Sequence, residues 1–389
     1  MDKLNILYIT DNVGLGGGET SLVDHLVNLN KDRYCPVVVC PDEGELTAEL
    51  VRCGIRVEIV HFTLVKRYAS AFVKYPLDVT YELFKRLKRE QINIVNANGF
   101  NCMLIIAPAV RMSNVPLVWT CHGWWPSGKI TGMFINIFAD KIIAVSGYVK
   151  NKLINEGNVK RSKIVHIPLG IDLARYNDIR SDNCLRQEFN LDLESPIVGM
   201  IGRFQRLKGH MTFVIMASEI CKRYPQMKFL MVGGEVFGDR AEYEYGEEVR
   251  EYIHDLRLEN NIVVTGFRRD IPRILGCLDV LVVPSEVETF GMVILEAMAA
   301  GVPVISCARG GPREIIKNGG NGFIIDGQDS KQLAEKVLQV IESPSLMLDI
   351  IVNGKNTVRE LYQIKDQVGK IESLYLELMG LRDNENFNG

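Results

Sequence analysis

Two glutamates flank a turn in the stretch PSEVETFGMVILEAMAAGVPVIS, residues 284–306. Glu288 and Glu296 are separated by seven residues, and Glu296 is the one charged side chain in the apolar run 292–300. A helix that is apolar on every side is expected to be buried, and an ionised carboxylate is costly to bury without partners. Glu296 therefore needs hydrogen-bond donors, and the two hydroxyls of a ribose would supply them.

The turn between the two glutamates favours an anion. Phe290 and Gly291 precede a helix expected to begin near Met292. The first N–H groups of that helix, including the N–H of Val293, have no partner within the helix and point toward an anion. A diphosphate bound there would leave Glu296 on the ribose side and the other glutamate on the sugar side. The alternative is that Glu296 only favours the positive end of the helix.

Two cations lie in a second strand-to-helix turn, GMIGRFQRLKGH. Arg203 can grip a phosphate with two parallel hydrogen bonds, and Lys208 supplies a point charge. The helix is expected to begin near Gly209. Two ordinary surface cations are the alternative, but their place in a glycine-flanked turn favours a diphosphate site.

The first half of the chain supplies a glycine loop and a histidine. The loop DNVGLGGGET follows the first strand, and Gly16 and Gly17 allow the backbone to approach an anion. A dinucleotide fingerprint fails there, because Glu19 occupies its third glycine position. His122 ends a strand in WTCHGWW, whose tryptophans suit a sugar face or a lipid interface. A bare glycine turn and a packed histidine are the alternatives.

The elements that must position these residues are short apolar runs alternating with helical stretches, which is typical of parallel strands covered on both faces. Runs in the first half are LNILYIT, CPVVVC, VEIV, INIVNAN, PLVWTCH, KIIAVS and KIVHIPLG. Runs in the second half are PIVGMIG, KFLMVGG, NIVVTGF, VLVVPS, VPVISC and GFIID. Because ligands bind at the carboxyl ends of such strands, the candidate turns are expected to meet in one deep cleft.

The polar segment 173–195 separates the two series of strands. We therefore expect two doubly wound α/β domains, residues 1–185 and 186–365. Residues 366–389 are expected to form a C-terminal helix that packs back toward the N-terminal domain, followed by a disordered tail.

The composition of the 389 residues is 47% hydrophobic and 24% charged, with a net charge of −3, as in ordinary globular domains. Nine cysteines without CxxC pairs argue for a reducing compartment and against a disulfide framework or a zinc site. No signal peptide precedes the first strand, and no apolar run reaches the roughly 18 residues of a membrane span. We expect a cytoplasmic protein without a nucleic-acid partner.

A basic excess lies in residues 64–89. Its members are Lys66, Arg67, Lys74, Lys85, Arg86, Lys88 and Arg89, against Asp78 and Glu82. A surface for anionic lipid head groups at the inner face of the membrane is one interpretation. A solvated helix end is equally open.

Taken together, the motifs resemble those of the retaining glycosyltransferases of family four, which have the GT-B fold. EVETFGMVILEAMAAGVPVI resembles the Glu, seven residues, Glu motif of that family, and GRFQRLKGH resembles its GRxxxxKG phosphate motif. GLGGGET resembles its GGxE loop, TCHG its TxHG strand end, and VTGFRRDIPRIL its nucleobase strand. AVSGYVK and IPLGID resemble its interdomain stretches, and GGPREIIKNGGNGFII its last substrate-domain signature. The resemblance covers almost the whole chain, and Leu169 departs from the usual Asn.

The resemblance implies a nucleotide-sugar site in the C-terminal domain and an acceptor site in the N-terminal domain. Arg203 and Lys208 would neutralise the leaving diphosphate, Glu288 would contact the donor sugar, and Glu296 would hold the ribose. The phosphate turn and the base pocket would consist of Phe290, Gly291, Met292 and Val293, and of Gly266, Phe267 and Arg268.

In the N-terminal domain, Gly16 and Gly17 would offer N–H groups to the diphosphate or sugar. His122 would lie across the cleft beside the donor sugar and the acceptor. The implied catalytic residues are Glu288, His122, Arg203 and Lys208. Neither a metal nor a cofactor is expected, because the two cations and the helix end take the place of a cation. The two domains are expected to close around the site.

The implied reaction moves a hexosyl or N-acetylhexosaminyl group, with retention, from a nucleotide diphosphate sugar to a glycan or lipid-linked acceptor. A UDP-sugar is expected as donor, with GDP open, in the synthesis of bacterial surface polysaccharide or glycoconjugate. A nucleotide-sugar epimerase, a dinucleotide-dependent oxidoreductase and a non-catalytic sugar-nucleotide binding protein are the alternatives.

Overall fold

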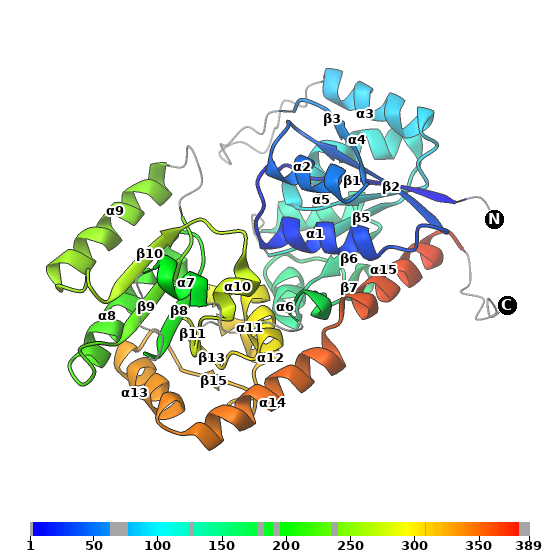
Figure 1. Ribbon diagram of the computed structural model, residues 1–389. Helices are drawn as coiled ribbons and strands as arrows, with labels where there is room; N and C mark the ends of the chain where they lie inside the picture. Colours follow the sequence, from blue (N-terminus) through cyan, green and yellow to red (C-terminus); the bar gives the residue numbers. More distant parts are fainter. Residues whose placement is uncertain are drawn as a thin grey trace. The chain divides into compact units, whose positions relative to one another are not determined.

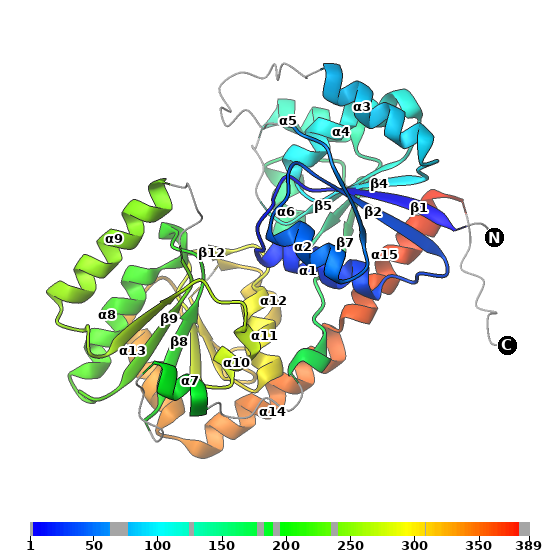
Figure 2. The same ribbon diagram turned by 45° about the horizontal axis from the view of Figure 1, so that its top comes forward.

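The computed structural model describes residues 3–62, 77–123, 128–176, 183–189, 195–234, 240–307 and 309–380. The chain divides into two compact units. The first comprises Met1–Gly170 with Ile364–Gly389, and the second comprises Ile171–Gln363. Each unit is a parallel sheet with helices on both faces, as the sequence predicted (Figures 1 and 2).

The first junction between the units differs from the boundary expected near residue 185, whereas the second, between Gln363 and Ile364, lies two residues from the one expected at 365. The Ile171 N–H donates to the carbonyl oxygen of Tyr362 over 2.8 Å, and Ile171 forms a β-bridge with Gln363. The chain therefore joins the end of the second unit as soon as it leaves Gly170. Local polarity suggested a linker at 173–195, but the described parts of this segment belong to the second unit.

The sheet of the first unit has seven strands in the order β3-β2-β1-β4-β5-β6-β7. Each of the seven apolar runs predicted in this part of the chain is confirmed as a strand. The strands are β1 (Leu4–Ile9), β2 (Tyr34–Cys40), β3 (Arg56–Ile59), β4 (Ile94–Ala97), β5 (Leu117–Cys121), β6 (Lys141–Ala144) and β7 (Ile164–His166). The helices are α1 (Gly17–Asn28), α2 (Glu45–Arg52), α3 (Leu77–Arg89), α4 (Phe100–Ser113), α5 (Lys129–Phe138), α6 (Gly147–Asn155), the short η1 (Arg161–Lys163) and α15 (Ile364–Leu378).

The C-terminal helix α15 lies beside α1 in the first unit (Figures 1 and 2). A chain of buried polar groups fixes it there. The Asn96 side-chain amide donates to the Tyr375 hydroxyl over 2.7 Å, and the Tyr375 and Tyr8 hydroxyls lie 3.1 Å apart. The Tyr8 hydroxyl is in turn 2.8 Å from Nε2 of His25. Buried polar groups that find partners in this way specify one packing of a core.

The main sheet of the second unit has six strands in the order β10-β9-β8-β11-β13-β15, and β12 and β14 form a separate pair. The six predicted runs are confirmed, whereas the two-residue strands β12 and β14 escaped prediction. The strands are β8 (Ile197–Ile201), β9 (Lys228–Val232), β10 (Ile262–Gly266), β11 (Val280–Val283), β12 (Val287–Glu288), β13 (Val304–Ser306), β14 (Arg309–Gly310) and β15 (Phe323–Ile324). The helices are η2 (Leu173–Tyr176), α7 (Asn183–Glu188), η3 (Arg206–Lys208), α8 (His210–Cys221), α9 (Arg240–Asp255), α10 (Ile271–Leu275), α11 (Met292–Ala300), α12 (Pro312–Ile315), α13 (Ser330–Ile341) and α14 (Pro344–Leu361).

Each sheet has one point where the direction of winding reverses. In the first unit it lies between β1 and β4, and in the second it lies between β8 and β11. Ligands of open parallel sheets bind outside the carboxyl ends of the strands at such points. The turns that follow these four strands are therefore the places to search for a site.

Among the helices described, no single one has the length and apolar composition of a membrane span. The consecutive helices α13 and α14 satisfy that composition only as a pair, and the chain bends by 97° between them.

Candidate functional site

Lys208 and Glu288 meet at the switch point of the second unit. Lys208 ends η3 after β8, and Glu288 ends β12 after β11. The Lys208 Nζ lies 2.6 Å from Oε1 of Glu288, and the Ser285 hydroxyl donates to the same oxygen over 2.8 Å. Both charged side chains are half-buried, so the pair is shielded but reachable from solvent. Two residues that the sequence offered from separate motifs thus form one site.

The two turns that carry this pair are bonded to each other. The Glu286 N–H donates to the Leu207 carbonyl oxygen over 2.8 Å. Gly209 adopts a φ of 78°, and a Cβ placed on it would lie 2.1 Å from the Pro284 carbonyl oxygen. No side chain fits this close approach, so the glycine after Lys208 is required by packing.

The N-terminus of α11 adjoins Glu288 in the chain. Gly291 precedes the helix with a φ of 103°, a conformation that favours glycine. No side chain in the described ranges caps the first turn of α11. An uncapped helix N-terminus of this kind suits an anion, and the role predicted for Gly291, Met292 and Val293 stays a prediction.

The expectation that α11 is buried on every side is wrong. The buried residues of this helix are Ile294, Leu295, Ala297, Met298 and Ala299. Met292, Val293, Glu296 and Ala300 keep partial exposure and form one stripe. Glu296 lies on this stripe, one turn after Met292, so a ligand on the end of the helix could reach its carboxylate.

Arg203 occupies the same strand-to-helix turn as Lys208 but is exposed and lies near a different carboxylate. Its Nη1 is 3.9 Å from Oε1 of Glu242, a buried residue of α9. The Gln205 side-chain amide donates to that same oxygen over 2.5 Å. Sequence reasoning missed Glu242, because it sits in a polar, acidic helix where nothing distinguishes it from its neighbours.

The residues predicted to line the base pocket follow one another at the end of β10. Gly266 takes a φ of 69°, its carbonyl oxygen accepts the Gly233 N–H over 3.0 Å, and the Phe267 ring is exposed. The Arg268 guanidinium is held by the carboxylates of Asp270 and Glu188, at 2.8 and 2.6 Å. These carboxylates raise the pKa of Arg268 above its ordinary value. The guanidinium is thus engaged in two ion pairs, whereas the Phe267 ring is open to solvent.

In the first unit, His122 lies at the carboxyl end of β5 beside Asn98, which follows β4. The His122 Nε2 is 2.8 Å from Oδ1 of Asn98, and an amide oxygen only accepts, so Nε2 carries the proton. Burial lowers the pKa of His122 to about 4, which leaves the imidazole neutral at pH 7. Sequence reasoning missed Asn98, although the strand end INIVNAN offered a polar signal.

The glycine loop reaches the same edge of the first sheet. A Cβ placed on Gly18 would lie 3.8 Å from the His122 ring. The Gly16 N–H, expected to meet a ligand, instead donates to Oε2 of Glu19 over 3.1 Å. The Asn12 amide donates to the other Glu19 oxygen over 2.5 Å. The buried Glu19 thus gives the Gly16 N–H an acceptor within the protein, while Gly17 begins α1.

Across the described residues, no group of three His, Cys, Asp or Glu side chains is placed to hold a metal ion.

The basic segment 64–89 offers less free charge than its composition suggested. Lys66, Arg67 and Lys74 lie outside the described residues. On α3, Arg86 pairs with Glu58 and Glu82, and Nε of Arg89 lies 3.0 Å from the Glu90 carboxylate.

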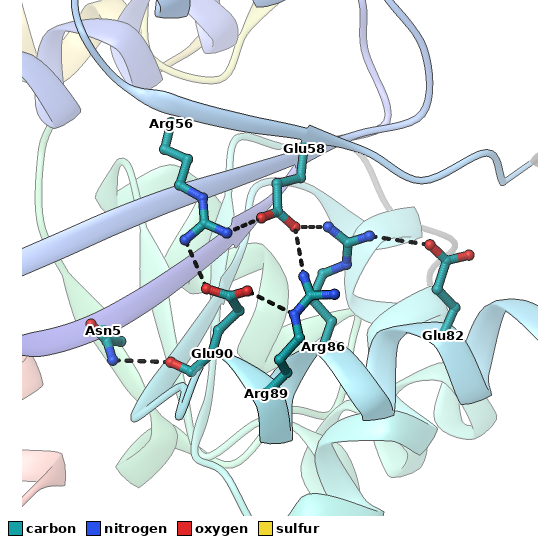
Figure 3. Close-up of polar contacts among 7 residues, drawn as sticks. All are labelled: Asn5, Arg56, Glu58, Glu82, Arg86, Arg89 and Glu90. Atoms are coloured by element: carbon teal, nitrogen blue, oxygen red, sulfur yellow. Dashed lines mark hydrogen bonds and ion pairs between the residues drawn. The ribbon is translucent and has the colours of Figure 1, made fainter.

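Figure 3 shows these charges interleaved, with Arg56 bridging Glu58 and Glu90. Arg86 and Arg89 therefore belong to a network of positively and negatively charged side chains and do not form a basic patch. The ion pairs join α3 to β3 across the chain.

Two family models match the chain. Glycosyltransferase Family 4 matches residues 15–175, and Glycosyl transferases group 1 matches residues 182–357. Together they match most of the sequence and divide it close to the junction between the two units.

Named relatives are similar to the chain over most of its length. The Escherichia coli UDP-Gal:alpha-D-GlcNAc-diphosphoundecaprenol alpha-1,3-galactosyltransferase is 29% identical over 397 residues, covering 97% of this chain and 98% of that protein. The Bacillus anthracis N-acetyl-alpha-D-glucosaminyl L-malate synthase is 26% identical over 250 residues, covering 64% of this chain and 62% of that protein.

Solved structures share the fold over nearly the whole chain. Anabaena HepE in complex with UDP-glucose is 25% identical, with a TM-score of 0.81 over 95% of this chain and 100% of that chain. A glycosyltransferase from Rickettsia africae is 23% identical, with a TM-score of 0.85 over 99% of this chain and 100% of that chain. The two family models, the relatives and the two parallel sheets agree: the chain belongs to the family 4 glycosyltransferases and has the GT-B fold.

Proposed function

We propose that this glycosyltransferase moves a hexosyl or N-acetylhexosaminyl group from a UDP-sugar to a lipid-linked glycan acceptor, with retention at the anomeric carbon and without a metal ion. The observation that carries the proposal is the contact between Lys208 and Glu288 at the switch point of the second unit, beside the N-terminus of α11. A cation, a carboxylate and a helix end at one place suit a diphosphate that carries a sugar.

Lys208 and Arg203 are the groups that would stabilise the leaving diphosphate. Lys208 is bound to Glu288 in the structure, so an arriving phosphate would compete for its ammonium group. Releasing Glu288 in this way would free a carboxylate at the sugar end of the donor. Fixed donors aimed at a developing charge are usually the largest single contribution to catalysis.

Glu296 would hold the ribose of the donor. Its position on the partly exposed stripe of α11, one turn from Met292, fits a nucleotide whose phosphate lies on the helix end. Two ribose hydroxyls would donate hydrogen bonds to the carboxylate, which is the role inferred from the sequence. Phe267 and the backbone at Gly266 would meet the base.

His122 would act as a neutral imidazole toward the sugar or the acceptor. Its Nε2–H is occupied by Asn98, which leaves Nδ1 to accept a hydrogen bond from a hydroxyl. Gly18, the second residue of α1, adjoins the ring and adds no side chain there. The first unit would therefore bind neutral hydroxyl groups, as an acceptor site requires.

The lipid-linked acceptor is supported by the Escherichia coli relative, whose name gives UDP-Gal as donor and a GlcNAc-diphosphoundecaprenol acceptor. An acceptor of that kind lies in a bilayer, so the protein would work at the inner face of the membrane. The acceptor belongs to the chemistry of bacterial surface polysaccharide or glycoconjugate synthesis.

The test is a panel of UDP- and GDP-sugars offered with a GlcNAc-diphospho-lipid acceptor, with detection of the released nucleotide and NMR of the product. We expect release of UDP from one UDP-hexose, dependent on the acceptor, and an unchanged anomeric configuration. An inverted product would contradict retention. An epimerised sugar nucleotide formed without acceptor would overturn the transfer reaction itself.

A further inference from the structure

Helix α5 presents three large apolar side chains to solvent on one face. Ile130, Met133 and Ile137 are 70%, 58% and 53% exposed. Their spacing of three and four residues places them in one stripe along the helix. Single exposed apolar residues are ordinary, but a contiguous stripe on a short helix marks a binding surface.

The stripe cannot turn inward, because the opposite face of α5 is fixed by close packing. Gly132 and Ile135 are the buried residues of the helix. A Cβ placed on Gly132 would lie 1.7 Å from the carbonyl oxygen of Gly157, so the helix backbone rests directly on the turn after α6. Rotation of α5 would drive a side chain into that turn.

Basic residues flank the stripe. Lys129 begins the helix, and α5 contains no acidic residue. Asn136, near the C-terminal end of α5, holds Lys160 close to the helix. The Asn136 Oδ1 accepts the Lys160 N–H over 2.9 Å, and the Asn136 side-chain amide donates to the Asn158 carbonyl oxygen over 3.0 Å. Arg161 follows directly in the chain. None of these three cations forms an ion pair with another described residue.

Two acidic residues of the described chain that lie close to α5 and its supporting turn both have partners. The Asp140 carboxylate accepts the Leu117 N–H over 2.8 Å, and Glu156 pairs with Lys152 at 3.7 Å. The surface therefore combines an exposed apolar stripe with unneutralised positive charge. On α3, by contrast, Arg86 and Arg89 are paired with carboxylates.

We propose that α5 lies in the head-group layer of an anionic bilayer, with Ile130, Met133 and Ile137 among the acyl chains. Lys129, Lys160 and Arg161 then lie at the level of the lipid phosphates. Amphipathic helices with this arrangement bind the interface, and each nearby cation strengthens the attraction.

A second copy of the chain is a poorer occupant of this surface. A symmetric contact through α5 would bring Lys129, Lys160 and Arg161 of one copy toward the same cations of the other, and like charges repel. Anionic lipid supplies the complementary charge. The proposal rests on the proposed lipid-linked acceptor in one respect: α5 is the surface that would bring the enzyme to that acceptor.

The first experiment is flotation of the full-length protein with vesicles of phosphatidylcholine, with or without phosphatidylglycerol. We expect the wild type to float with the anionic vesicles. A variant carrying Ile130→Asn, Met133→Asn and Ile137→Asn should lose about tenfold or more in partitioning. Val51→Asn, at a residue of α2 that is 63% exposed, is the matched control and should leave partitioning unchanged.

Charge reversal provides the second arm. Lys129→Glu with Lys160→Glu and Arg161→Glu should remove the preference for anionic vesicles. Thermal unfolding of each variant checks that it is folded, which is expected because all substituted side chains are exposed. Equal flotation of the wild type and the asparagine variant overturns the proposal.

Two further readouts separate this proposal from its rivals. Sedimentation without lipid that shows a dimer, lost in the asparagine variant, would assign the stripe to a second copy and overturn the membrane role. Sugar transfer to a short-chain, soluble acceptor should be the same in all variants. If the wild type transferred no sugar yet bound vesicles through α5, the proposed reaction would fail while the membrane surface stood.

Discussion

The two sheets of the protein follow one plan, but the turns at their carboxyl ends differ in charge. In the second unit these turns carry Arg203, Lys208 and Glu288 beside the end of α11. In the first unit the turns after β1, β4 and β5 contain no lysine or arginine, and Asn98 and His122 lie at the edge together with the carboxylates of Asp11 and Glu19. One fold thus supports two kinds of site, because side chains at strand ends, and not strand order, set the chemistry.

The difference suggests a division of labour. An edge with cations and a helix end suits a diphosphate, and an edge without cations, with polar side chains and glycines, suits hydroxyl groups. Catalysis by leaving-group stabilisation would then depend on the second unit, while the first unit would orient the sugar and the acceptor. Variants at the two edges should therefore differ in kind as well as in size.

Removal of the Lys208 ammonium should have the largest effect. Lys208→Ala deletes a donor to the leaving diphosphate and leaves Glu288 without its ion-pair partner, so kcat/KM should fall by roughly 30- to 1,000-fold, equivalent to about 2 to 4 kcal/mol. Arg206→Ala is the matched control, because Arg206 lies in the same turn but pairs with the exposed Glu248. Steady-state kinetics measure both. Activity of Lys208→Ala within threefold of wild type would remove the charged edge from catalysis.

The two glutamates around the α11 turn should give separable effects. Glu288→Gln acts beside the reacting carbon and should lower kcat by about 100-fold, because its interaction strengthens as the sugar gains positive character. Glu296→Gln should raise the donor KM by about tenfold, the cost of weakening a charged hydrogen bond to the ribose, with a smaller change in kcat.

The measurement is kcat and donor KM for each glutamine variant. An unchanged donor KM in Glu296→Gln would favour the helix-dipole explanation for this carboxylate. A pure KM effect in Glu288→Gln would place that residue away from the reacting carbon.

The edge without cations, in the first unit, is tested by the pH dependence of activity. Asn98→Asp puts a carboxylate against His122, which favours the imidazolium and raises its pKa from about 4 toward or above its ordinary value. The neutral imidazole is then lost as pH falls through that raised pKa, so the acid limb of kcat/KM should move upward by about two units. Activity at pH 8 should change less.

Asn98→Leu, which removes the partner without adding charge, is the control and should lower activity without moving the acid limb upward. Titration of the His122 ring protons by NMR gives an independent reading. An unmoved His122 resonance in Asn98→Asp would show that the contact does not set the protonation of this ring.

Metal removal should have the smallest effect. Because cations and a helix end face the diphosphate site, activity in EDTA should stay within about twofold of the untreated enzyme. Added Mg²⁺ or Mn²⁺ after chelation is the companion measurement. Loss of activity in the chelator, with recovery on adding either ion, would mean that the cations and helix end of the second unit do not suffice to offset the diphosphate charge. The comparison between the two units would then be incomplete.

Much of the fold and of the site followed from the sequence. The apolar runs could be predicted as strands because short runs rich in β-branched residues indicate locally buried strands. The motif residues Arg203, Lys208, Glu288 and His122 lie at strand ends as predicted. Such placements are local, since a strand end and the turn after it are adjacent in the chain.

Three features that the sequence left open or placed differently share one cause, which is that a partner distant in sequence leaves no local signal. The arginines of α3 are interleaved with Glu58 from β3, and the Arg268 guanidinium is taken by Glu188 from α7. The segment near residue 185 resembles a linker in composition, yet Ile171 already bonds to the last residues of the second unit. A prediction from composition alone treats these arginines as unpaired and this segment as a linker.

The sequence by itself determined the strands, their parallel character and the turns that carry the chemistry, because these depend on patterns a few residues long. Only the tertiary structure decided which side chains meet. Lys208 reaches Glu288 because β8 and β11 are neighbours in the sheet, and Asn98 orients His122 because β4 lies beside β5. Strand order depends on how the whole chain packs, and the exposed stripe of α5 depends on the glycine contact that fixes its opposite face.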